Sequence, residues 1–229
     1  IRETVKDPAT AEKLVPHGYP IGAKRICLGT DFYETFNRPN VTLVDVKSAP
    51  ITGLTETGLR TTAGDFDLDV IVFATGFDAV TGAILRIDIQ GPGGSLAEVW
   101  ADGPVAMMGV MIHGFPNLHM ITGPGSPSVL SNVLASVEQH VEWVSDLLGY
   151  MKQNDLDRVE PEAEAQARWV AHVAEVAERT LMGQANSWYM GANVPGKPRV
   201  FLPYIGGVDA YRRHCNKVVA AGYEGFRLD

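Results

Sequence analysis

Two adjacent cations, Lys24 and Arg25, stand in a chain whose overall balance is acidic. Most such pairs lie on a solvated surface and do no chemistry. A lysine or arginine is nevertheless what a dinucleotide 2′-phosphate requires, and the forked donors of a guanidinium suit it to hold a short-lived anion. The pair is therefore a candidate anion site, with a solvated surface pair as the alternative.

A second candidate lies in residues 67–79, DLDVIVFATGFDA. Residues 70–74 are apolar, rich in β-branched side chains and uninterrupted by polar ones, which predicts a central parallel strand buried on both faces. The run ends at Thr75 and Gly76, and a glycine at such a strand end lets the backbone approach a ligand. The alternative is a buried strand followed by an ordinary turn.

The segment 123–132, GPGSPSVLSN, separates a predicted strand from a predicted long helix. Its glycines resemble the start of a dinucleotide-binding loop, but Pro124 and Pro127 lack the backbone donors that a phosphate cradle uses. We expect a stiff loop that presents N–H groups at a helix N-terminus near Asn132 and Val133. The alternative is a loop that only caps the helix.

Residues 184–199 form a loop rich in Gly, Asn and Pro that carries one tryptophan, Trp188. The sequence Pro-Gly-Lys-Pro within it excludes a regular element. A loop of this length is either a packed Ω-loop or a lid. Trp188 therefore either contacts a ligand or only anchors the loop to the core.

Five stretches together carry a resemblance to a known family. They are GAKR (22–25), FNRPNV (36–41), ATGFDA (74–79), GPGSPSVLSN (123–132) and SWYMGANVPGKPRVF (187–201). In this order they resemble the C-terminal portion of flavin-dependent Baeyer–Villiger monooxygenases, closest to the phenylacetone and steroid monooxygenase branch. The resemblance covers nearly the whole chain.

The resemblance implies a role for each candidate residue. Arg25 is the catalytic residue that stabilises a flavin peroxide, and Lys24 is the ligand of the NADP 2′-phosphate. The remaining cofactor-binding residues are Thr75, Gly76, Phe77, Asp78, Asn132, Val133 and Trp188, whose indole N–H binds the nicotinamide cofactor as loop 184–199 closes. The substrate-binding residues are Ser128, Val129, Leu130 and Leu202. No metal site is implied.

The same resemblance implies the reaction. NADPH reduces FAD, O2 forms a C4a-peroxyflavin, and this peroxide attacks a ketone so that one oxygen is inserted to give an ester or lactone. The expected partners are a small-molecule ketone, O2 and the N-terminal half of the same enzyme. Because the two glycine-rich phosphate loops would lie in that half, this chain alone is expected to be inactive. The alternatives are a related flavoprotein N- or S-oxygenase, or a non-catalytic fragment that completes a partner chain.

The implied fold class is α/β, the C-terminal part of a flavoprotein with two Rossmann-like dinucleotide-binding domains, incomplete without its N-terminal half. Residues 1–20 would end a helical insertion. Residues 21–74 would form the second half of the NADP-binding domain. Residues 75–229 would form the C-terminal part of the FAD-binding domain, with its helices and loop 184–199 covering the cofactor.

The elements that must position these residues follow from sequence periodicity. Long helices are predicted at 131–153, 161–182 and 208–221. The first carries an apolar stripe at spacings of three and four, formed by Val133, Val137, Val141, Val144, Leu148 and Met151. His140 lies in this helix and is interpreted as a structural histidine. A short helix is expected after Asp7, a hairpin at 51–62, further strands at 41–46, 107–111, 118–121 and 200–204, and a loose C-terminus.

Composition excludes several classes of function. The chain has 229 residues and a formal net charge of −8, which argues against nucleic acid as a partner. No uncharged run approaches the ~20 residues of a membrane-spanning helix. The first residues lack the apolar core of a signal peptide. Cys27 and Cys215 show neither metal nor disulfide spacing, which indicates a reducing cytoplasm.

Overall fold

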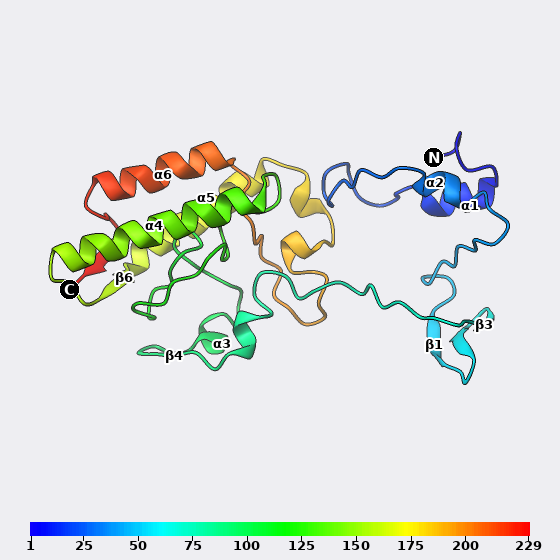
Figure 1. Ribbon diagram of the computed structural model, residues 1–229, viewed down its shortest axis with the longest axis horizontal. Coiled ribbons are helices and arrows are strands. Elements are labelled where there is room, and N and C mark those ends of the chain that lie inside the picture. Colours follow the sequence, from blue (N-terminus) through cyan, green and yellow to red (C-terminus); the bar gives the residue numbers. More distant parts are fainter. The chain divides into compact units, whose positions relative to one another are not determined.

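A computed structural model describes all residues, 1–229, as two compact units (Figure 1). Unit 1 comprises Ile1–Tyr19 and Ile26–Gly76, and unit 2 comprises Pro20–Arg25 and Phe77–Asp229. These two units do not test the three-part division expected from the sequence, which stays a prediction. No helix in either unit combines the length and the apolar character that a membrane crossing requires.

Unit 1 contains two short helices and a small antiparallel sheet. Its elements are α1 (Pro8–Leu14), α2 (Phe32–Thr35), β1 (Ile51–Leu54), β2 (Gly58–Thr61) and β3 (Gly64–Asp67). The helix predicted after Asp7 is confirmed, because the Asp7 carboxylate caps α1 by accepting from the Thr10 N–H at 2.9 Å. The predicted hairpin is also confirmed, with Leu54 opposite Leu59. The third strand, β3, was not predicted; it pairs antiparallel with β2.

The buried central strand predicted at residues 70–74 is wrong in this structure. The segment forms no strand, and the side chains of Val70 and Phe73 are 74% and 75% exposed. A strand needs neighbours for its N–H and C=O groups and cover for both faces, and no other segment of these 229 residues supplies them. Thr75 and Gly76 are therefore exposed rather than placed at a strand end. The strand predicted at 41–46 is absent too.

Unit 2 is organised around three long helices. Its elements are η1 (Ile84–Arg86), β4 (Gln90–Gly91), β5 (Gly94–Ser95), α3 (Leu96–Val99), α4 (Val133–Gln153), β6 (Val159–Pro161), α5 (Ala163–Glu178), η2 (Met182–Gln184), η3 (Trp188–Met190), α6 (Val208–Ala220) and β7 (Phe226–Leu228). The three predicted long helices are confirmed as α4, α5 and α6. The C-terminus, predicted to be loose, instead forms β7 and pairs antiparallel with β6.

Three further predicted strands, 107–111, 118–121 and 200–204, are wrong as regular elements. Isolated bridges join Met107 to Met111 and Pro127 to Tyr204. At Met108 and Gly109 the backbone has φ of 56° and 72°, so the chain turns back on itself within the first apolar run. Residues 107–111 and 202–204 are buried in irregular structure, whereas Ile121 in the second run is 41% exposed. Periodicity does not separate a buried irregular segment from a short buried strand.

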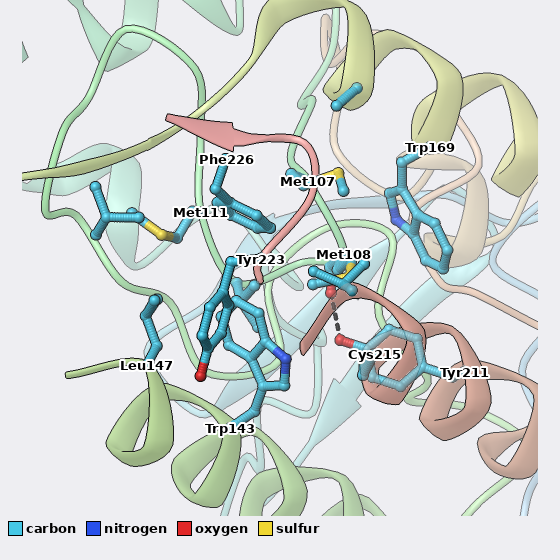
Figure 2. Close-up of a cluster of buried hydrophobic side chains, with 14 of the residues drawn as sticks. Met107, Met108, Met111, Trp143, Leu147, Trp169, Tyr211, Cys215, Tyr223 and Phe226 are labelled. Atoms are coloured by element: carbon cyan, nitrogen blue, oxygen red, sulfur yellow. Dashed lines mark hydrogen bonds between the residues drawn. The ribbon is translucent and has the colours of Figure 1, made fainter. Parts of the chain in front are cut away.

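The core of unit 2 lies where α4, α5 and α6 meet the 107–111 turn and β7 (Figure 2). The buried face of α4 carries Trp143, Leu147 and Met151, and most of the predicted valine stripe lies outside it, with Val133 and Val141 close to half exposed. The stripe was misplaced because the face with the larger side chains buries more apolar area. The buried face of α5 carries Trp169 and Val173.

His140 is fully buried and joins α4 to α6 through hydrogen bonds. The Thr122 N–H donates to His140 Nδ1 at 2.9 Å, so the proton of the neutral ring is on Nε2, which lies 2.8 Å from Tyr211 Oη. The Tyr211 hydroxyl in turn donates to the Met108 carbonyl at 2.5 Å (Figure 2). The structural interpretation of His140 is therefore confirmed. Burial lowers the pKa of His140 from 6.5 to about 4.

We expect this histidine to make folding stability depend on pH. Between pH 6.5 and 4 the unfolded chain binds a proton at His140 that the folded chain does not, so stability falls as pH falls through that window. The expected loss is about 3 kcal/mol in the free energy of unfolding. Urea unfolding of the wild type and of His140→Gln at several pH values checks this. Equal pH slopes for the two proteins would contradict it.

Candidate functional site

Within unit 2 the structure brings the predicted catalytic arginine to the predicted substrate loop. The Arg25 guanidinium donates from Nη1 to the carbonyl oxygen of Val129, a residue 104 positions later in the chain. The Arg25 residue as a whole is exposed, as is its neighbour Lys24. A guanidinium stays charged in proteins, so the contact places a permanent positive charge beside loop 123–132.

Both ends of loop 123–132 are held by α4. Thr122, just before the loop, donates its N–H to His140 on that helix. At the other end the Asn132 side chain caps α4 by accepting from the Leu134 N–H at 3.0 Å. The predicted position of the loop at a helix N-terminus is therefore confirmed, with α4 beginning at Val133.

The middle of loop 123–132 is bonded to the segment 202–204. The Gly125 N–H donates to the Leu202 carbonyl at 2.7 Å, and the Tyr204 N–H donates to the Ser126 carbonyl at 2.8 Å. The Ser126 N–H is also used, because it donates to the Gly123 carbonyl. The N–H groups of Gly125 and Ser126 are thus engaged in holding the loop itself.

Gly125 adopts a backbone conformation that other residues rarely reach. Its φ is +80°, and a Cβ built on it would lie 3.1 Å from Trp169 Nε1. The Trp169 indole N–H donates to the Gly125 carbonyl at 3.2 Å, so the buried tryptophan of α5 lies directly against the loop. The glycine permits this close approach between backbone and indole.

An open cleft of about 390 Å³ lies between this loop and the start of α6. Its lining includes Leu130, Ser131, Tyr204, Gly207 and Arg213. Of the four predicted substrate-binding residues, Leu130 lines the cleft and is 65% exposed. Val129 and Leu202 are instead buried, and Ser128 is half-buried. Assignment of these four residues to a substrate pocket stays a prediction.

Loop 184–199 is bonded to Leu202 and to Phe77 and Asp78. Trp188 opens the helical turn η3 and is half-buried, with its ring 4.5 Å from that of Tyr189 between centroids. The Leu202 N–H donates to the Tyr189 carbonyl at 2.8 Å, which ties this turn to the residues that hold the substrate loop. Near its other end, the loop reaches Phe77 and Asp78 through Asn193 and Lys197.

The chain was compared with family models, with curated proteins and with solved structures. No protein-family model matches the chain. It is 43% identical over 230 residues to cyclohexanone 1,2-monooxygenase from Acinetobacter sp., which covers 100% of this chain and 42% of that protein. A solved steroid monooxygenase bound to NADP superposes with a TM-score of 0.90 and 49% identity, covering 99% of this chain and 43% of that one. Homologues of this chain are Baeyer–Villiger monooxygenases.

Further relatives extend this result. A solved structure of OTEMO in complex with FAD and NADP superposes with a TM-score of 0.93 and 42% identity, covering 100% of this chain and 42% of that one. A phenazine N-monooxygenase from Lysobacter antibioticus is 41% identical over 230 residues, covering 100% of this chain and 42% of that protein. The chain thus spans less than half the length of the Baeyer–Villiger monooxygenases it matches. The family resemblance found in the sequence is confirmed, and so is the fold class, part of a larger FAD- and NADP-binding flavoprotein.

Sequence reasoning missed several residues that hold the site together. Tyr204 and Tyr189 provide backbone partners for the two loops. Asn193 and Lys197 were left without a role, although both lie in the SWYMGANVPGKPRVF stretch, which was the available signal. Thr75 and Gly76 belong to unit 1, whereas the other predicted site residues belong to unit 2.

We expect Gly125→Ala to destabilise the protein by about 2 kcal/mol, because the positive φ alone costs an L-residue roughly 1–2 kcal/mol and Trp169 leaves little room for a Cβ. The matched control is Gly149→Ala in α4, where a Cβ meets nothing within 4 Å. That change should be neutral or stabilise by up to about 1 kcal/mol. Thermal and urea unfolding measure both. Equal stability of the two variants would contradict the close contact at Gly125.

Proposed function

We propose that this chain belongs to an FAD- and NADPH-dependent monooxygenase that inserts one oxygen atom of O2 next to a ketone carbonyl to give an ester or lactone. The observation that carries the proposal is the hydrogen bond from the Arg25 guanidinium to the Val129 carbonyl. It joins the predicted catalytic residue to the predicted substrate loop in a chain whose homologues are Baeyer–Villiger monooxygenases. The activity belongs to the whole protein, of which the chain spans about 42% in these relatives.

The residues present fit the two cofactors. Lys24 and Arg25 are adjacent cations, a donor set suited to a 2′-phosphate and to negative charge near a flavin. When bound, FAD reduced by NADPH supplies the activated oxygen. Lys24 would hold the NADP 2′-phosphate, and the Trp188 indole N–H would bind the nicotinamide half. Phe77, Asp78, Asn132 and Val133, with Thr75 and Gly76, remain proposed cofactor neighbours.

Arg25 would act by charge and position. Its bond to the Val129 carbonyl restricts the guanidinium before substrate arrives, so little reorganisation is needed when a carbonyl oxygen becomes negative during oxygen insertion. In a site from which water is excluded, that fixed charge is worth more than in water. Leu130, beside the open cleft, and the neighbouring Ser128, Val129 and Leu202 would set the shape of the ketone that is accepted.

The partners are a small-molecule ketone, O2 and the N-terminal half of the same enzyme. The domain division expected from the sequence at 1–20, 21–74 and 75–229 is kept as part of the proposal. A cytoplasmic location is proposed because Cys215 is buried, Cys27 is exposed and neither forms a disulfide.

A second candidate function is oxygenation of a ring nitrogen. It is favoured by the phenazine N-monooxygenase from Lysobacter antibioticus, which is 41% identical to this chain. Substrate-dependent NADPH consumption separates the two, because a ketone stimulates the first activity and an aromatic N-heterocycle stimulates the second. The mass of the product, an ester or an N-oxide, decides between them.

We expect Arg25→Ala in the full-length protein to lower ketone oxygenation by about 10²- to 10³-fold, the range found when a preorganised charge stabiliser is removed. Flavin reduction by NADPH under anaerobic conditions should persist, because the proposed role of Arg25 follows reduction. The control is Arg179→Ala, which removes only an exposed pair with Glu175 on α5. Product analysis and stopped-flow absorbance measure the two steps. Unchanged ester formation in Arg25→Ala would contradict the proposed role.

A further inference from the structure

Three hydrogen bonds fasten loop 184–199 to the segment 77–79, more than 100 positions earlier in the chain. The Asn193 side-chain amide donates to the Phe77 carbonyl at 2.8 Å. The Lys197 ammonium lies 2.5 Å from Asp78 Oδ1 and also donates to the Ala79 carbonyl at 3.1 Å. We call Asn193, Lys197 and Asp78 the latch.

The central ion pair of the latch is buried at its lysine end and exposed at its aspartate end. The Lys197 side chain is 9% exposed and that of Asp78 is 36% exposed. Burying an ammonium is costly unless it is paired and hydrogen-bonded, and here a carboxylate and a carbonyl meet that need. Water and salt screen such a pair less than they screen a surface pair. For comparison, the Arg179–Glu175 pair on α5 has side chains that are 70% and 60% exposed.

The stem of Lys197 lies against the turn that carries Trp188. Gly191 ends η3 with φ of +66°, and a Cβ built on it would lie 3.5 Å from both Cγ and Cδ of Lys197 and 2.8 Å from the Pro198 carbonyl oxygen. The Gly191 N–H donates to the Trp188 carbonyl at 3.1 Å. The Lys197 stem thus packs against the end of the turn that carries Trp188.

The other side of that turn is fixed independently. The Leu202 N–H donates to the Tyr189 carbonyl, and Tyr189 is almost fully buried. One side of the turn is thus bonded to the segment beside loop 123–132, and the other side depends on the latch. Because a backbone hydrogen bond at a buried residue is hard to open, the latch is the side of the loop that opens more readily.

We propose that Lys197, with Asp78 and Asn193, is a positioning residue that holds loop 184–199 against the segment 77–79 and thereby fixes Trp188. The positioning role of Asp78 is distinct from its proposed role as a cofactor neighbour, because here its carboxylate binds the Lys197 ammonium. The consequence for catalysis rests on the proposed function. With the latch broken, a larger share of turnovers would reduce O2 to hydrogen peroxide, with NADPH and a proton consumed and NADP+ released, and a smaller share would form ester.

The first test measures the loop directly and does not depend on the reaction. Chymotrypsin cleaves after aromatic residues, so Trp188 and Tyr189 report on opening of the loop. In full-length Lys197→Met, the cleavage rate in the loop should rise about tenfold, which corresponds to a shift of roughly 1.4 kcal/mol in the opening equilibrium. Lys152→Met, at an exposed lysine in the last turn of α4, should leave the rate unchanged.

A double-mutant cycle checks that Lys197 acts through Asp78. Asp78→Asn should also raise the cleavage rate, and adding Lys197→Met to it should give little further increase, because both changes remove the same pair. Lys197→Arg, which keeps the charge, should retain most of the protection. A cleavage rate in Lys197→Met within about twofold of the wild type would overturn the latch, since residues that share a contact couple by more than that. The latch would also be overturned if the rise in cleavage rate in the double variant equalled the product of the rises in the two single variants, because the two residues would then act independently.

The second test measures coupling of the reaction. Lys197→Met should raise the hydrogen peroxide formed per NADPH consumed while the rate of anaerobic flavin reduction stays near that of the wild type. If neither the wild type nor any variant oxygenates a ketone, the proposed function is wrong. The cleavage rates still show whether the latch holds the loop. If oxygenation is intact and its coupling is unchanged in Lys197→Met, the positioning role is overturned while the proposed function stands.

Discussion

The buried hydrogen-bond chain through His140 is the constraint on which the arrangement of unit 2 depends. It begins at the Thr122 N–H, passes through the His140 ring and the Tyr211 hydroxyl, and ends at the Met108 carbonyl. An unpaired polar group at this depth would cost about 1–3 kcal/mol, so every member holds its neighbour in place. The residue at its start immediately precedes loop 123–132. A single helix, α4, therefore sets where that loop begins and, through Asn132, where it ends.

Much of the helical structure could be predicted from the sequence because its signals are local. The cap at Asp7, the hairpin at 51–62 and the positions of α4, α5 and α6 all follow from neighbouring residues. Properties that depend on distant partners could not be predicted. The apolar run at 70–74 looks like a buried strand but has no flanking strand in these residues, and β7 pairs with a strand about 65 positions earlier. Local periodicity predicts neither the missing neighbours of 70–74 nor the pairing partner of β7.

The candidate site, too, could be predicted from the sequence only in part. The roles of Arg25, Lys24 and Trp188 came from family motifs, because isolated cations and a tryptophan in a loop have no periodicity that would indicate chemistry. The structure adds how these loops are held: Val129 receives Arg25, Leu202 bonds both Gly125 and Tyr189, and Lys197 bonds Asp78. Such contacts join positions some 10 to 120 residues apart, so only the folded chain shows them.

The unequal burial of the four tryptophans has an optical consequence. Trp100, Trp143 and Trp169 are each at most 4% exposed, whereas Trp188 is half-buried in a loop. A solute such as iodide or acrylamide, which quenches indole emission on contact, would therefore reach one fluorophore ahead of the others. The polypeptide carries its own reporter for displacement of residues 184–199, and no dye needs to be attached to follow it.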